Sequence, residues 1–105
     1  MIDKNMQIVL AHSNKKYTNK LKNGILKKHL KNVQVFDDGF KALAYIIQNY
    51  SELIIVEEDL PNLSAEDIQN ALIFKGIKSK LLILKNNKQD FHKIEFTLSQ
   101  NYTIS

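Results

Sequence analysis

Short apolar runs alternate along this chain with longer stretches in which apolar residues recur every three or four positions. The runs are rich in β-branched residues and are bounded by polar ones, a pattern typical of strands buried in a sheet. The longer stretches have the periodicity of amphipathic helices. The runs predict strands at Met6 to Ala11, Val33 to Phe36, Leu53 to Val56 and Lys80 to Leu84, and a small fifth strand at Tyr102 to Ile104.

The stretches between the runs predict helices with recognisable ends. Ser13 or Asn14 can cap the first helix, because either side chain can accept a hydrogen bond from a free amide. Ser64 with Asp67 three residues later resembles a capping box, and Gly76 is placed to end that helix. The four predicted helices lie at about 14–30, 40–50, 64–76 and 91–98.

This alternation predicts a single α/β domain with a parallel sheet and helices on both faces. A chain of 105 residues is long enough to bury one core. Cysteine is absent, which excludes disulfides, thiolate zinc sites and cysteine nucleophiles. No signal peptide or membrane-spanning run is apparent, so we expect a soluble, cytoplasmic protein without membrane attachment.

The charge of the chain is modestly basic. All 15 basic residues are Lys, and the net charge is +4. Specific base recognition depends strongly on bidentate Arg, so direct nucleic-acid binding is not favoured. The lysines concentrate on the first predicted helix, where they form either a functional surface or a solvated face that reflects compositional bias.

The stretch Glu52 to Pro61 joins a buried strand directly to a group of acids. Ligand sites of open parallel sheets lie at the carboxyl ends of the strands, so this edge is the candidate functional site. The polar residues predicted to share it are His12, Ser13, Glu57, Glu58, Asp59 and Lys85.

The order and spacing of these segments resemble the receiver domain of two-component response regulators. The resemblance covers about Gln7 to Leu84. The matching residues are Asp38, Gly39, Ala42 and Leu43 in the turn into the second helix, and Leu60 and Pro61 after the third strand. The resemblance implies a flavodoxin-like, doubly wound sheet with strand order 2-1-3-4-5, and the fifth helix that usually closes a receiver is missing.

In that family a carboxylate accepts a phosphoryl group, acids hold magnesium, and a Lys and a Ser or Thr contact the phosphoryl oxygens. This sequence departs from each of these features. Glu57 stands at the acceptor position, one methylene longer than Asp. His12 and Ser13 replace the acidic pair, although magnesium prefers carboxylates. Lys85 stands where Ser or Thr is expected, and no Lys follows Lys93 to serve as the fifth-strand Lys.

Two interpretations of these substitutions are open. Glu57 and Lys85 follow adjacent strands and are predicted to form an ion pair in the space of the metal and phosphoryl group. Otherwise they are solvated loop charges, which contribute little to stability. His12 is expected to be a hydrogen-bonded structural residue. The sequence has only three glycines, which cannot build a Gly-rich phosphate loop. We therefore expect no catalytic residue, metal or cofactor.

The resemblance implies a receiver-like signalling domain that acts through protein–protein interaction in bacterial signal transduction or transcription control. One alternative is a receiver that accepts a phosphoryl group at Glu57, Glu58 or Asp59, and another is a Lys-rich nucleic-acid-binding module. Without a fifth helix, Leu82 and Leu84 are expected to expose apolar surface. A homodimer through the face of strands four and five, an effector domain of the same protein, another protein partner or the fourth helix itself would cover it.

Overall fold

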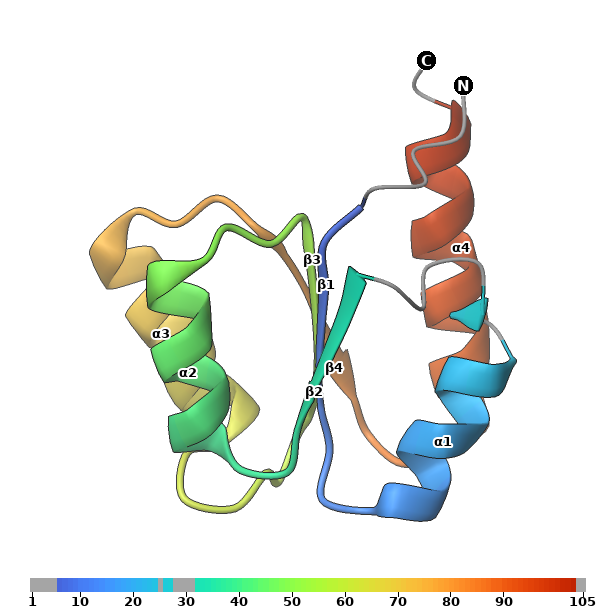
Figure 1. Cartoon of the computed structure of the whole chain (residues 1–105), viewed down its shortest axis with the longest axis horizontal. Helices are drawn as coiled ribbons and strands as arrows, with labels where there is room; N and C mark the ends of the chain where they lie inside the picture. The colour runs from blue at the N-terminus through green and yellow to red at the C-terminus, as the bar shows by residue number, and fades with distance from the viewer. Residues whose placement is uncertain (1–5, 25, 28–31, 104–105) are drawn as a thin grey trace.

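The computed structural model describes residues 6–24, 26–27 and 32–103, which form a parallel sheet covered by helices on both faces (Figure 1). The strands are β1 (Ile8–Ala11), β2 (Val33–Phe36), β3 (Leu53–Glu57) and β4 (Lys80–Leu84), in the order β2-β1-β3-β4. The helices are α1 (Lys15–Asn23), α2 (Gly39–Gln48), α3 (Ala65–Lys75) and α4 (Gln89–Thr103). The predicted doubly wound, flavodoxin-like architecture is confirmed for these elements. None of the described helices has the length and apolar character needed to cross a membrane.

Each central strand contributes to two hydrophobic cores, because successive side chains point to opposite faces of the sheet. Leu10 and Ile55 belong to the core that α1 and α4 cover, together with Leu21 and Ile94. Ala11, Ile54 and Val56 belong to the core that α2 and α3 cover. Both cores are fully covered at β1 and β3, which explains why these strands carry no polar residue before their carboxyl ends.

α1 is shorter than its apolar pattern predicts. Asn14 caps its start, with the side-chain oxygen accepting from two backbone N–H groups of the first turn. The helix ends at Asn23 with Gly24 as its C-cap, whereas the prediction continued it to about Leu30. Gly is a poor residue within a helix, so the helix stops where the sequence has one. Residues 25 and 28–31 lie outside the described part of the chain.

The predicted ends of α3 are confirmed. Ser64 Oγ accepts from the Asp67 N–H at 3.2 Å, and the Asp67 carboxylate accepts from the Ser64 N–H at 3.2 Å, which completes the capping box. Gly76 ends the helix with φ 68°, in the left-handed region where a residue without Cβ is favoured.

The Asp38–Gly39 turn is held against the loop that follows β3. Asp38 caps α2, and the Gly39 N–H donates to the Pro61 carbonyl at 2.8 Å. A Cβ at position 39 would lie 2.2 Å from the Leu63 carbonyl oxygen. The glycine of this turn is therefore required by the close approach of two loops at the carboxyl edge of the sheet.

The carboxyl end of the chain differs from the prediction. Tyr102 and Thr103 belong to α4, so the fifth strand predicted at Tyr102 to Ile104 is wrong as far as the structure describes it, and Ile104 lies outside the described part. α4 packs on the same face as α1 (Figure 1), where it buries Leu84 completely and leaves Leu82 half-buried. The expected exposure of Leu84 is therefore wrong, because the fourth helix covers it. Among the described residues, β4 is left as one edge of the sheet.

Candidate functional site

Glu57 is the last residue of β3 and lies almost buried at the carboxyl edge of the sheet, with 7% of its surface exposed. Its side chain lies on the same face as those of Leu53 and Ile55, the face that α1 and α4 cover. Ala11 pairs with Val56, so His12, the next residue of the first strand segment, comes beside Glu57. The pleat and register of two strands therefore bring these two polar residues together.

Both carboxylate oxygens of Glu57 accept hydrogen bonds from within the protein. Oε1 accepts from the Ser13 N–H at 2.9 Å and from Ser13 Oγ at 2.8 Å. Oε2 accepts from Asn86 Nδ2 at 3.1 Å. Glu57 thus links the loops that follow β1 and β4.

His12 completes this network on the side of Asn86. Its Nδ1 accepts from the Asn14 N–H at 3.0 Å, which assigns the proton of the neutral ring to Nε2. Nε2 then donates to Asn86 Oδ1 at 3.0 Å, which leaves the Asn86 amide nitrogen free to donate to Glu57. Although His12 Nδ1 lies 3.8 Å from Glu57 Oε1, the contact is no ion pair in this tautomer. The predicted structural role of His12 agrees with this geometry.

The network keeps Glu57 ionised. Burial by itself would raise the pKa of Glu57. The hydrogen bonds from the Ser13 N–H and hydroxyl and from Asn86 favour the charged form more strongly, and the net effect is a pKa below the ordinary value.

Asp90, which the sequence analysis did not single out, fixes the loop that carries Asn86. It is completely buried in the first turn of α4. Oδ1 accepts from the Lys85 N–H at 3.0 Å, and Oδ2 from the N–H groups of Asn86 at 2.9 Å and Asn87 at 3.3 Å. Asn86 has φ 60°, a left-handed conformation that Asn tolerates. The signal in the sequence was the polar run Asn86, Asn87 followed by an acid at a helix start.

Tyr17 packs against this network from the side of α1. Its ring centroid lies 4.6 Å from that of His12 and 6.0 Å from that of Phe91. Its hydroxyl is buried and has no hydrogen-bond partner among the described residues. Burial, and then the negative charge of Asp90, raises the pKa of Tyr17.

The predicted ion pair between Glu57 and Lys85 does not form. The Lys85 side chain is exposed, and among the described residues it makes no ion pair with Glu57 or with the two acids that follow. The reason is the alternation of the strand: Leu84 faces the core beside Glu57, so the next side chain points away from it. Asn86, one residue later, reaches Glu57 instead.

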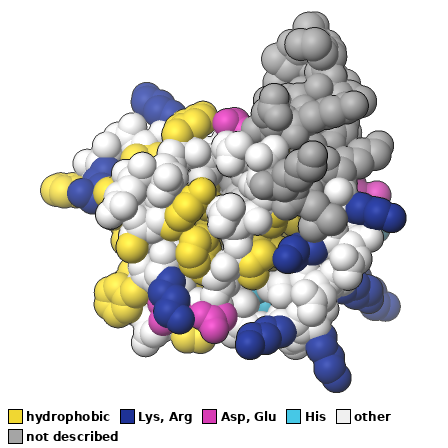
Figure 2. Space-filling view, viewed as in Figure 1, with side chains coloured by type: hydrophobic (Ala, Val, Ile, Leu, Met, Phe, Trp, Pro, Cys, Tyr) yellow, Lys and Arg dark blue, Asp and Glu magenta, His cyan; other side chains and the backbone are white. Residues whose placement is uncertain are grey.

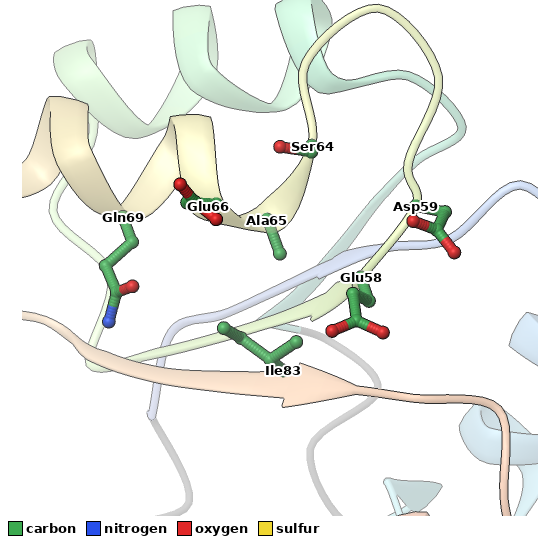
Figure 3. Close-up of a pocket in the computed structure, with 7 residues that line it drawn as sticks. All are labelled: Glu58, Asp59, Ser64, Ala65, Glu66, Gln69 and Ile83. Carbon is green, nitrogen blue, oxygen red and sulfur yellow. The ribbon is translucent and has the colours of Figure 1, made fainter.

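Glu58 and Asp59 are separated from Glu57 although they follow it directly. Both are exposed, and they line a pocket of about 320 Å³ between the end of β3, the first turns of α3 and β4. Figure 3 shows Glu58 beside Ile83 of β4, with Glu66 and Gln69 projecting from α3. The predicted acidic cluster is thus divided between the two faces of the sheet.

The residues at this edge do not fit the magnesium ion that the receiver resemblance implies. Ser13 uses its hydroxyl as a donor to Glu57, and Asn86 turns its amide nitrogen toward the same carboxylate. Magnesium needs oxygen lone pairs directed at it in octahedral geometry. In the part of the chain that the structure describes, no three His, Cys, Asp or Glu side chains form a group that could hold a metal ion.

Comparison with known proteins identifies a similar fold but no family. No protein-family model matches the sequence, and no curated protein matches it. Among solved structures, the chain is similar to the N-terminal domain of an uncharacterized protein from Wolinella succinogenes, with a TM-score of 0.69 and 16% sequence identity. The match covers 90% of this chain and 75% of that one. At this identity the likeness establishes the fold, a doubly wound parallel α/β sheet of the flavodoxin-like type.

Proposed function

We propose that this chain is a receiver-like signalling domain that performs no phosphoryl transfer and acts by binding other proteins. The observation that carries the proposal is the hydrogen bonding of Glu57. The residue stands where a receiver has its acceptor Asp, but each of its carboxylate oxygens already accepts from Ser13 or Asn86.

A phosphoryl acceptor needs an oxygen lone pair that is free to attack phosphorus in line, with positive charge nearby to stabilise the transition state. Glu57 would have to break its bonds to Ser13 and leave a nearly buried position to attack. Lys85, the cation that the sequence predicted to pair with it, is exposed and directed away from it. The arrangement therefore favours a structural carboxylate over a nucleophile.

The receiver assignment is supported by the turn motifs and the fold together. Gly39 is packed against Leu63, so the matching Asp-Gly turn has a structural basis. The surfaces that we propose for partner contact are the exposed lysines of α1 and the free edge of β4. Figure 2 shows several Lys side chains on the side of the molecule where α1 lies.

The test is intact mass spectrometry after incubation with a small-molecule phosphodonor and magnesium. The wild-type chain and the Glu57→Gln variant are compared, with circular dichroism to show that both are folded. We expect no phosphoryl adduct on either chain. An adduct on the wild type that is lost in Glu57→Gln would refute the proposal.

The same experiment addresses the alternative that Glu58 or Asp59 accepts the phosphoryl group. Both carboxylates are exposed beside a pocket, which favours them over Glu57 on accessibility. An adduct on both chains that peptide mapping locates to Glu58 or Asp59 would support this alternative. A nucleic-acid-binding module would instead show affinity that falls steeply with added salt.

A further inference from the structure

Within the part of the chain that the structure describes, β4 presents an unpaired row of backbone groups along the free edge of the sheet. On its inner side, the Lys80 N–H donates to the Glu52 carbonyl at 3.0 Å, and the Leu84 carbonyl accepts from the Glu58 N–H at 2.8 Å. In a parallel pair, residues whose backbone N–H and C=O groups point toward the neighbouring strand alternate with residues whose groups point away from it. Leu81 and Ile83 therefore direct their N–H and C=O groups away from the sheet.

The side chains of this edge do little to prevent pairing with another strand. Natural edge strands are usually protected by charges, Pro, bulges or a covering element. In β4 the only charge is Lys80 at its start, and Leu81, Leu82 and Ile83 are each only partly buried. The opposite edge, β2, carries no charge, and its two middle residues, Gln34 and Val35, are both exposed.

Charge changes sign along the same edge on the face that α3 covers. Where β4 ends, the pocket brings together the exposed carboxylates of Glu58, Asp59 and Glu66, which outnumber the two exposed lysines of the following loop, Lys85 and Lys88. Where β4 begins, Lys78 in the connection from α3 is exposed. If a second strand lies antiparallel to β4, the first residues of that strand lie beside the acidic end of β4.

We propose that the free edge of β4 binds the β4 of a second copy of this chain, antiparallel and about a twofold axis near Leu82. Leu81 then lies opposite Ile83 of the second copy, and the two residues exchange both of their outward hydrogen bonds. The twofold axis repeats this pair, and Leu82 faces its own copy. The result is one continuous sheet through both molecules.

A second copy fits this edge because every requirement of the edge is met by β4 itself. The occupant must be extended and apolar in its middle, and its beginning must be basic to face Glu58 and the neighbouring acids. Ile73 of α3 supports the arrangement, since it lies on the same helix stripe as Glu66 and Gln69 and is 72% exposed. The twofold axis would bring this stripe toward its copy. The dimer does not depend on the chemistry of Glu57, so its test is separate from the phosphodonor experiment.

Sedimentation velocity from micromolar to millimolar concentration tests the association, and hydrogen exchange by NMR locates it. We expect a concentration-dependent dimer. The amides of Leu81 and Ile83 should exchange quickly in dilute solution and slow down as the dimer forms, whereas those of Lys80, Leu82 and Leu84 should be protected at all concentrations. A chain that stays monomeric at millimolar concentration, or a dimer in which Leu81 and Ile83 still exchange quickly, would overturn the proposal.

Charge reversal tests the orientation of the two strands. Glu58→Lys and Lys78→Glu should each weaken the dimer about tenfold at low salt. In each variant a surface charge pair becomes repulsive, and the twofold symmetry makes this pair occur twice in the dimer. The double variant should recover most of the affinity. Glu95→Lys on the exposed face of α4 makes the same charge change away from β4 and should leave the affinity unchanged. Equal weakening by Glu95→Lys, or no recovery in the double variant, would contradict antiparallel pairing through β4.

Discussion

Replacing Glu57 by Gln should destabilise the protein, because the network around it has only one consistent assignment of donors and acceptors. His12 Nδ1 must accept from the Asn14 N–H, so Nε2 donates to Asn86 Oδ1 and the Asn86 amide nitrogen must donate to residue 57. Ser13 already donates to the other oxygen. A Gln at position 57 therefore turns its own NH₂ group toward a donor, whichever way it is rotated.

The expected loss follows from the bonds that change. One hydrogen bond is replaced by a contact between two donors, and the bonds from Ser13 lose the strength that an ionised acceptor gives them. A buried donor left without its acceptor, together with weaker remaining bonds, costs about 2 to 3 kcal/mol of the free energy of unfolding. A small domain with about 5 kcal/mol or more of stability would still fold.

Urea unfolding followed by far-UV circular dichroism measures this loss as a lower midpoint with an unchanged slope. The matched control is Glu58→Gln, which removes the neighbouring, exposed carboxylate and should change stability by less than about 0.5 kcal/mol. If the two variants lost the same stability, or if Glu57→Gln were as stable as the wild type, the network would not be a source of stability and the structural role of Glu57 would be wrong.

Three further predictions follow from the same edge of the sheet. The folded-state pKa of Glu57 is lowered, so the stability difference between wild type and Glu57→Gln should be complete above about pH 4.5. The difference should shrink as the pH falls through the folded pKa. Urea titrations at several pH values measure it, and a difference that grows on acidification would contradict this. Asp90→Asn should cost about 2 to 4 kcal/mol in urea unfolding, because Asp90 accepts from three backbone N–H groups, whereas Asp37→Asn at an exposed ion pair should cost less than about 0.5 kcal/mol. Gly39→Ala should lower the free energy of unfolding by about 3 kcal/mol or more in thermal and urea unfolding, since its Cβ would lie 2.2 Å from a backbone oxygen. The control Gly76→Ala is strained only by its positive φ and should lower it by about 1 kcal/mol.

The strands and most helix ends could be predicted from the sequence because their causes are local. The apolar run of β3, the capping box at Ser64 and the left-handed Gly76 each depend on residues within a few positions of one another. The fifth strand failed because Tyr102 and Thr103 have strand propensity on their own. Their conformation is set by the helix that contains them, whose residues Ile94 and Leu98 bury against the sheet. Tertiary packing outweighs propensity in so short a segment.

The candidate site was predictable only in part, for a related reason. Parallel strands bring their carboxyl ends to one edge, so the approach of His12 and Ser13 to Glu57 followed from topology. Which residue of the last loop reaches Glu57 depends on the pleat of β4 and on the left-handed conformation of Asn86. The ion pair was predicted from the adjacent strands and the opposite charge of Lys85, but a sequence pattern does not give the direction of its side chain.

If Glu57 occupies the acceptor position of a receiver, as we propose, its extra methylene explains how that position can take a structural role. A longer side chain extends the carboxylate beyond the strand end, where it accepts from the loop after β1 and from the loop after β4 at the same time. In a switchable receiver these loops would have to respond to a change of charge at the acceptor. Here Glu57 keeps its charge through its lowered pKa, and Asp90 independently fixes the second loop by three backbone bonds. The two buried carboxylates therefore hold the carboxyl edge in one arrangement, and in the function that we propose the signal comes from what binds the surface of the domain.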